Sequence, residues 1–253
     1  MGLLSPLDWQ QPWYRPWADV GQAVGEAMTD GSAVHGALNR VAAAWQVDCP
    51  RFVPQFALAS GQAYESHVAE RWECPTRDNL HDYFNGLCWL KFPQTKRRLN
   101  QLQSAQIQRD GIQGRRGPVR DAITLLDESA ALLCAPEPIW QALCAKDWQR
   151  LFITLRPLWA ESSLLLFGHA SLERLVVPRK PMVSHVCIPK YAIHFEADAM
   201  QNLDQQLARD LDEIHLATKP FAPLPLMGVP GWCEANSAPD FYADTRVFRV
   251  SSP

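Results

Sequence analysis

The chain has 253 residues, of which 47% are hydrophobic and 20% are charged, and its formal net charge is −3. This composition is typical of a folded globular protein and excludes a disordered or fibrous chain. The small negative charge disfavours nucleic acid and acidic membrane surfaces as partners. No stretch of the sequence approaches the roughly 20 apolar residues of a membrane span, so we expect no membrane partner.

The seven cysteines are scattered along the chain and form no C-x-x-C pair, which disfavours a zinc ribbon or a disulfide framework. The first residues, MGLLSPLDWQQPWYRPW, lack the basic leader and the sustained apolar run of a signal peptide. We therefore expect reduced thiols and a cytoplasmic location.

The first 72 residues predict three helices and one strand. Apolar residues recur every three or four positions over 18–30 and 32–45, which predicts two amphipathic helices, the second capped by Ser32. The segment RFVPQF that follows them predicts a short edge strand, because Pro54 cannot donate to a ladder. Residues 63–72 predict a helix that ends before the pair Cys74-Pro75.

A helical hairpin is predicted next. NLHDYFNGLCWL is expected to form its first helix with Asp78 as the N-cap, and PQTKRRLNQLQSAQIQRD its second, which Gly111 ends. DAITLL and AALLC then bracket DES, a pattern that favours a β-hairpin, although runs this short are also compatible with helix.

The second half of the chain mixes helices with short strands. Residues 135–159 return to helical spacing, SSLLLF and MVSHVCIP predict strands, and a helix is expected from His169. Residues 196–217 predict one amphipathic helix, with its apolar side formed by Leu203, Leu207, Leu211 and Ile214.

These elements predict one mostly helical α+β domain over residues 1–253, with a small sheet built from the hairpin and the strands near 164 and 185. Residues 1–51 are expected to be a helical extension packed on the rest. The tail from residue 220 is rich in proline and aromatic residues, so we expect it to pack on the surface and bury its aromatic side chains, Trp232 among them.

The predicted helical hairpin contains the first candidate site. His81 and Asn85 are four residues apart and share a face of the first helix, while Lys96 and Asn100 share a face of the second. If the helices pack antiparallel, these side chains converge on one cleft, where a neutral His81 can act as a general base. The alternative is structural, with the same residues capping and joining two helices. Asp82 lies about 100° from His81 around the helix, which favours a solvent-facing or ion-paired residue over an orienting partner.

A second candidate is FGHASLE, in which His169 and Glu173 are spaced to meet one metal ion or to bond each other. Further ligands would have to come from His81, Asp82, Asp127 or Glu128, and no complete metal motif is present. A divalent metal is therefore one candidate cofactor, and a surface His–Glu pair is the alternative.

A third candidate is the basic run GRRGPVRD, where Arg115, Arg116 and Arg120 could surround a phosphate. It matches no phosphate-loop motif, so a solvated loop is the simpler interpretation, with Asp121 paired to one of the arginines.

Three blocks make the chain similar to a known family: CPTRDNLHDYFNGLCWLKFPQTKRRLN, LFGHASLERL and PLPLMGVPGWCEANSAPDFYADTRVFR. Together they resemble the bacterial family called domain of unknown function 3025, from about Phe52 to Arg249. The resemblance implies a bacterial, cytoplasmic protein with one conserved unit, and it supplies no activity. The residues in its motif positions are Arg77, Asn79, His81, Asp82, Asn85, Lys96, Asn100, His169 and Glu173.

Our leading hypothesis is a soluble hydrolase-type enzyme with a small-molecule or anionic ligand. In it His81 is the general base or a metal ligand, and His169 with Glu173 completes the site. We count Asn85 among the catalytic residues and expect it to orient the substrate together with Asn100. Lys96 or Arg77 would hold an anionic group, and Asn79 is a further substrate-binding residue.

The competing hypothesis is a non-catalytic binding or assembly protein in which the same residues form a buried network. A third, nucleic-acid binding, would need the basic side chains from Lys96 to Arg116 to form one exposed face. The enzyme hypothesis gains if His81 and His169 lie within about 10 Å of each other around a concave pocket. The sequence contains no signal for the oligomeric state.

Overall fold

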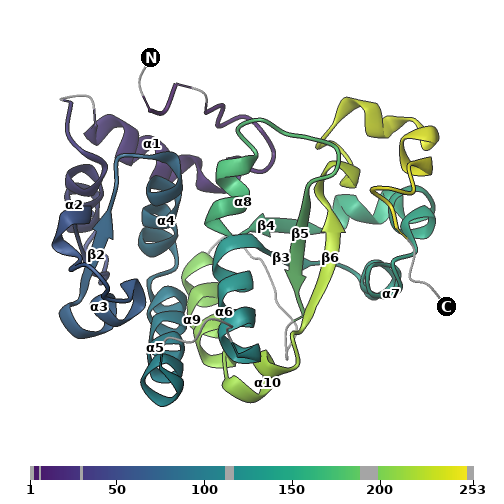
Figure 1. Ribbon diagram of the computed structural model, residues 1–253. Coiled ribbons are helices and arrows are strands. Elements are labelled where there is room, and N and C mark those ends of the chain that lie inside the picture. Colours follow the sequence, from purple (N-terminus) through teal and green to yellow (C-terminus); the bar gives the residue numbers. More distant parts are fainter. Residues whose placement is uncertain (1–2, 6, 29–30, 112–116, 189–198, 250–253) are drawn as a thin grey trace.

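Helices form most of the secondary structure in the computed structural model, which describes residues 3–5, 7–28, 31–111, 117–188 and 199–249 (Figure 1). The helices are α1 (Ala18–Ala27), α2 (Val34–Ala44), α3 (Tyr64–Arg71), α4 (Leu80–Lys91), α5 (Pro93–Asp110), α6 (Pro118–Ser129), α7 (Glu137–Ala145), α8 (His169–Arg174), α9 (Ala199–Asp210) and α10 (Glu213–Ala217). The strands are β1 (Arg51–Pro54), β2 (Glu73–Thr76), β3 (Ala130–Cys134), β4 (Ser163–Leu166), β5 (Val183–Cys187) and β6 (Phe221–Pro225). The prediction of a mostly helical α+β fold is confirmed.

Two small sheets lie on opposite sides of a group of helices (Figure 1). Strands β1 and β2 form a parallel pair, and the larger sheet has the order β4-β3-β5-β6. Its central strand β3 runs antiparallel to β4 and parallel to β5, and β6 closes the edge antiparallel to β5. Prolines are tolerated in β6 because an edge strand does not need every ladder donor. The predicted strands near 51, 164 and 185 are confirmed, whereas β2 and β6 were not anticipated.

The N-terminal segment packs on the rest of the molecule through aromatic side chains. The Tyr14 hydroxyl donates to the Leu172 carbonyl at 2.8 Å, and the Trp17 indole donates to the Leu166 carbonyl at 3.0 Å. Both side chains are buried, and α1 and α2 both contact α4. One hydrophobic core therefore extends from the N-terminal helices to the larger sheet.

The predicted β-hairpin over 121–134 is wrong in its first half. Residues 118–129 form helix α6, with Ala122, Ile123 and Leu126 buried on one face, and the chain becomes a strand only at Ala130. A helix is compatible with this run because its buried residues are spaced one and three apart, which also fits helical periodicity. The correction matters for function because it places Asp127 and Glu128 on a helix beside α8.

The single helix predicted over 196–217 is also wrong, and its first residues lie outside the described part of the chain. Helix α9 ends at Asp210, and Asp212 then caps α10 by accepting a hydrogen bond from the His215 backbone at 2.7 Å. Because of this break, α10 does not continue the apolar face of α9. Ile214 is 84% exposed, although its spacing predicted that it would lie on the apolar side of one continuous helix.

Two predicted helix caps also belong to other positions. Asn79 caps α4 by accepting from the Asp82 backbone, while Asp78 accepts from the backbone of Val34 at the start of α2. Ser32 therefore does not cap α2, and its hydroxyl instead accepts a hydrogen bond from Arg40. Side-chain oxygens of Asp, Asn and Ser can all accept from free N–H groups at helix starts, so the sequence alone did not identify which residue caps which helix.

The C-terminal tail buries some of its aromatic side chains as predicted, whereas Trp232 is only half-buried. Tyr242 and Phe248 are buried, and the Trp232 ring packs against Trp13 with a centroid distance of 5.7 Å. Phe152 and Phe248 would lie within 3.0 Å of a Cβ at Gly228, so only glycine fits at this turn without displacing a ring.

Candidate active site

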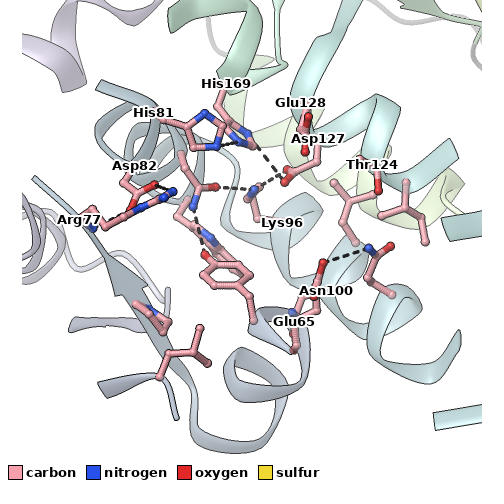
Figure 2. Close-up of a pocket in the computed structure, with 18 of the residues that line it drawn as sticks. Glu65, Arg77, His81, Asp82, Lys96, Asn100, Thr124, Asp127, Glu128 and His169 are labelled. Carbon is pink, nitrogen blue, oxygen red and sulfur yellow. Dashed lines mark hydrogen bonds and ion pairs between the residues drawn. The ribbon is translucent and has the colours of Figure 1, made fainter. Parts of the chain in front are cut away.

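A cavity of about 310 Å³ lies between α3, β2, α4, α5, α6 and α8. Most of its lining side chains are polar or charged (Figure 2). His81 and His169 lie at one end, Lys96 and Asp127 in the middle, and Glu65 and Asn100 toward the other end (Figure 2). The predicted helical hairpin, α4 with α5, therefore forms one wall, and α6 and α8 form the opposite one.

The start of α4 fixes the position of His81. The Asn79 side chain accepts from the Asp82 backbone at 2.8 Å, and Asp82 in turn accepts from the Arg77 backbone and guanidinium. The Asp82 side chain is only 8% exposed, and this ion pair provides its compensating charge. Asn79 and Arg77, both predicted to bind substrate, thus hold the first turn of α4 and orient the histidine that follows.

The start of α8 is held against the end of α6 by Gly168. A Cβ at this residue would lie 2.3 Å from the backbone nitrogen of Ser129 and 2.5 Å from the carbonyl oxygen of Glu128. Only a residue without a side chain permits this backbone approach. The contact places His169, the first residue of α8, beside Asp127 near the end of α6.

His81 and His169 contact each other at one end of the cavity. Their Nε2 atoms are 3.1 Å apart, and their ring centroids are 4.5 Å apart. Glu173 lies on the other side of His81, with its Oε2 atom 2.9 Å from Nδ1. His169 and Glu173 therefore do meet one partner, as their spacing suggested, but that partner is the imidazole of His81.

One arrangement of protons satisfies these contacts. A carboxylate only accepts hydrogen bonds, so His81 donates Nδ1–H to Glu173 and presents an unprotonated Nε2 to its partner. His169 then donates its Nε2–H to His81, and its own Nδ1 carries no proton. This assignment is consistent with the lack of a hydrogen bond between His169 Nδ1 and the carboxylate of Asp127, whose Oδ2 atom is 3.8 Å away.

Burial keeps His169 neutral. Its side chain is only 6% exposed, and desolvation lowers its pKa to about 4, although the nearby charge of Asp127 opposes the shift. Burial also opposes ionisation of Asp127, but the positive charge of Lys96 outweighs it and holds the pKa of Asp127 below its usual value. At neutral pH the site therefore combines a neutral His169 with an ionised Asp127 paired to Lys96.

A second chain of contacts starts at Lys96 in the middle of the cavity. The ammonium group donates to Asp127 Oδ1 and to Asn85 Oδ1, the latter at 2.8 Å. Asn85 in turn donates to the Tyr64 hydroxyl at 3.1 Å. The predicted convergence of His81, Asn85 and Lys96 is thus present, and Asn85 uses both ends of its amide on the protein.

Asn100 lies deeper along α5 and is 9% exposed. Its side chain donates to the backbone carbonyl of Glu65 at 2.9 Å, so it ties α5 to α3. The sequence analysis missed Tyr64 and Glu65 in this region, and it did not include Gln103 among the candidate site residues. Gln103 repeats the polar stripe of Lys96 and Asn100 at helical spacing, which was the available signal, whereas nothing in the sequence marked α3 as a neighbour.

Metal binding is limited by the number of ligands. Two imidazole nitrogens converge, but the described residues contain no group of three or more His, Cys, Asp or Glu side chains arranged to hold a metal ion. A divalent cofactor therefore stays a prediction.

The basic residues of α5 do not form one exposed face. Lys96 is buried, Arg98 donates to the Leu211 carbonyl, and Arg97 lies over the Trp72 ring. Asp121 pairs with Lys219, and Arg120 is buried. Arg115 and Arg116 lie outside the described residues, so their predicted phosphate site is not tested.

Comparison with known proteins assigns a family. A family model described as Protein of unknown function (DUF3025) matches residues 50–252. The chain belongs to this family. The match confirms the resemblance seen in the three sequence blocks, and it contains every residue of the cavity described above. Searches of curated proteins and of solved structures find no match. Among the described residues, no helix has both the length and the apolar character needed to cross a bilayer.

Proposed function

We propose that this DUF3025 protein is a hydrolase that uses His81 as a general base and neutral His169 as a hydrogen-bond donor to the reacting group. The observation that carries the proposal is the facing pair of Nε2 atoms at one end of a cavity. The outer nitrogen of His81 faces a carboxylate at hydrogen-bond distance, and the outer nitrogen of His169 has none within that distance. This asymmetry assigns the role of general base to His81 and the role of hydrogen-bond donor to His169.

His81 is suited to the role of base because one third of its side chain is exposed and its Nδ1–H is held by Glu173. A carboxylate in this position fixes the tautomer and stabilises the imidazolium that forms when Nε2 takes a proton. Because His169 occupies that nitrogen in the resting protein, the two rings must separate when substrate enters.

The proposed reaction is attack by water on an electrophilic carbon or phosphorus atom. His81 Nε2 takes a proton from the attacking water, and the water oxygen bonds to the electrophile. Negative charge then develops on the electrophile's oxygen, which His169 Nε2–H stabilises as a neutral donor. His81 finally gives its proton to the leaving group as the scissile bond breaks, so the enzyme returns to its starting protonation.

Lys96, Asp127 and Asn85 act as positioning residues in this scheme. The ammonium of Lys96 is only 5% exposed and pairs with Asp127, so it fixes the carboxylate that faces His169. Asn85 holds Lys96 in place through its amide oxygen.

A panel of chromogenic esters, anilides and phosphate esters tests the proposal. We expect the wild-type protein to hydrolyse at least one class, and His81→Gln and Glu173→Gln to reduce kcat by about 10²- to 10⁴-fold, the usual contribution of a general base. His35→Gln is the matched control, because His35 lies on α2 and does not line the cavity. Absence of turnover across the panel, or unchanged turnover in His81→Gln, would favour the non-catalytic binding protein instead.

Metal-assisted hydrolysis is a second candidate, favoured by the two converging nitrogens and by the carboxylate on the far side of His81, an arrangement common around metal-bound histidines. Elemental analysis of wild type and His169→Ala by plasma mass spectrometry separates the two mechanisms. The acid–base mechanism predicts substoichiometric metal in both proteins, whereas stoichiometric metal that is lost in the variant would establish the metal-assisted one.

We include a bacterial cytoplasm in the proposal. All seven cysteines are free thiols, which supports a reducing compartment. The bacterial source rests on the family resemblance alone.

A further inference from the structure

Hydrogen-bond acceptors dominate the end of the cavity formed by α3 and α5. The Gln103 amide donates from Nε2 to Glu65 Oε1 at 3.1 Å. This contact fixes the orientation of the amide, since a carboxylate cannot donate and the amide oxygen would be repelled by it. The Gln103 oxygen therefore faces away from Glu65.

Among the residues that the structure describes, that oxygen has no hydrogen-bond partner. Gln103 is only 4% exposed, and its Oε1 atom accepts no hydrogen bond although the residue lines the cavity. Buried side-chain acceptors without a donor are uncommon in folded proteins. A structural link between α3 and α5 does not require an unpaired Gln103 oxygen, because Asn100 already joins α5 to the Glu65 backbone. The unpaired acceptor points to a donor supplied by a ligand.

The charge of the cavity wall defines that donor further. Its carboxylates are Glu65, Asp82, Asp127 and Glu128, and its cations are Arg77 and Lys96. Arg77 pairs with Asp82 and Lys96 with Asp127, which neutralises both cations. Within the described part of the chain, no lysine or arginine forms an ion pair with Glu65. Among the described residues that line the cavity, the unpaired charge is therefore negative, which counts against the anionic ligand predicted from the sequence.

We propose that Glu65 and Gln103 bind a cationic nitrogen group, an ammonium or a guanidinium, of the molecule whose other end reaches His81 and His169. Such a group has several N–H donors and no acceptor, so it complements the carboxylate of Glu65 and the unpaired amide oxygen of Gln103. The inference rests on the proposed hydrolase function, and it names the substrates as amine- or guanidine-bearing molecules.

Ligand-observed NMR titration tests this subsite with four small probes of similar length: butylammonium, butylguanidinium, butanol and butanoate. We expect the two cations to bind the full-length wild-type protein, and the alcohol and the carboxylate to bind at least tenfold more weakly. Glu65→Gln keeps the size and the hydrogen bond to Gln103 but removes the charge, so it should weaken binding of both cations at least tenfold.

Glu70→Gln is the matched control, because Glu70 is an exposed carboxylate on the same helix and does not line the cavity. The affinity of Glu70→Gln for the two cations should equal that of the wild-type protein. Equal binding of the cations to wild type and Glu65→Gln, equal binding of butanol and butylammonium, or no cation binding at all would overturn the inference.

The same titration separates this inference from the proposed reaction. His81→Gln should bind butylammonium as tightly as wild type, since His81 lies at the opposite end of the cavity (Figure 2). Retained cation binding in a protein that hydrolyses nothing would contradict the reaction but leave the subsite established. Hydrolysis that depends on His81 but not on Glu65 would support the proposed reaction and contradict the subsite.

Discussion

Two polar networks in this protein differ in how completely their hydrogen bonds are made. In the C-terminal region, Asn236 is 1% exposed and donates to the carbonyls of Met227 and Val229, while its own oxygen accepts from Arg156. The Tyr242 hydroxyl completes this network through the carbonyl of Gly228. Around the cavity, by contrast, His169 Nδ1 and Gln103 Oε1 have no hydrogen-bond partner among the described residues, and the His81 side chain is one third exposed.

The difference separates a network that stabilises the fold from one that is available to a ligand. Buried polar groups with a structural role are normally paired, because an unpaired group loses its hydration without compensation. Unpaired polar atoms in residues that line a cavity therefore favour a role in binding a ligand. On this basis the C-terminal network should control stability, and the cavity network should control function.

The largest expected effect comes from breaking the C-terminal network. Asn236→Ala removes three buried hydrogen bonds, those to the carbonyls of Met227 and Val229 and the one from Arg156, although Arg156 keeps its bond to the backbone carbonyl of residue 236. We therefore expect a loss of about 4 kcal/mol in the free energy of unfolding. Urea denaturation measures this loss. A loss below about 1 kcal/mol would show that this network is not structural.

A smaller effect, dependent on pH, is expected from His169. Its folded-state pKa of about 4 lies below the ordinary value of 6.5, so between these two values the unfolded chain binds a proton that the folded protein does not. Stability should therefore fall as the pH decreases from 6.5 to 4, by up to about 3 kcal/mol from this residue.

The variant His169→Gln removes this contribution, so its stability should change less over the same pH range. Urea unfolding of both proteins at several pH values measures the difference. Parallel curves for wild type and variant would mean that His169 titrates normally.

The backbone approach at Gly168 should have the next largest effect. Gly168→Ala forces a Cβ against the end of α6, and we expect a loss of about 2 kcal/mol together with displacement of His169 from Asp127. Gly36→Ala is the control, since its Cβ would meet only the flexible end of Arg40 within α2. The free energy of unfolding of Gly36→Ala should rise by up to about 1 kcal/mol, because alanine has a higher helix propensity than glycine. Thermal unfolding that ranks the two variants in the opposite order would contradict the account.

Part of the candidate site could be predicted from helical periodicity. Spacing of four residues placed His81 with Asn85 and Lys96 with Asn100, and the Lys96–Asn85 contact joins the two helices as expected. The apolar spacing of α4 and α5 carries this information within a single stretch of chain.

The rest depends on tertiary packing that local patterns do not encode. α6 was predicted as a strand because its apolar residues are dense, so Asp127 had no predicted direction. α3 lies beside α5 in the fold, and the sequence contains no signal for that contact. The His81–His169 pair joins residues 88 positions apart, and it depends on a backbone contact at Gly168 that only the structure shows.

The smallest expected effect on stability is also the most direct test of the central claim, that the cavity histidines serve function rather than folding. The measurement is the free energy of unfolding of His81→Gln relative to wild type at pH 7. His81 contacts Glu173 and His169 near solvent, so we predict a change within about 0.5 kcal/mol. A loss of several kcal/mol, comparable to Asn236→Ala, would show instead that the histidine pair is part of the structural network.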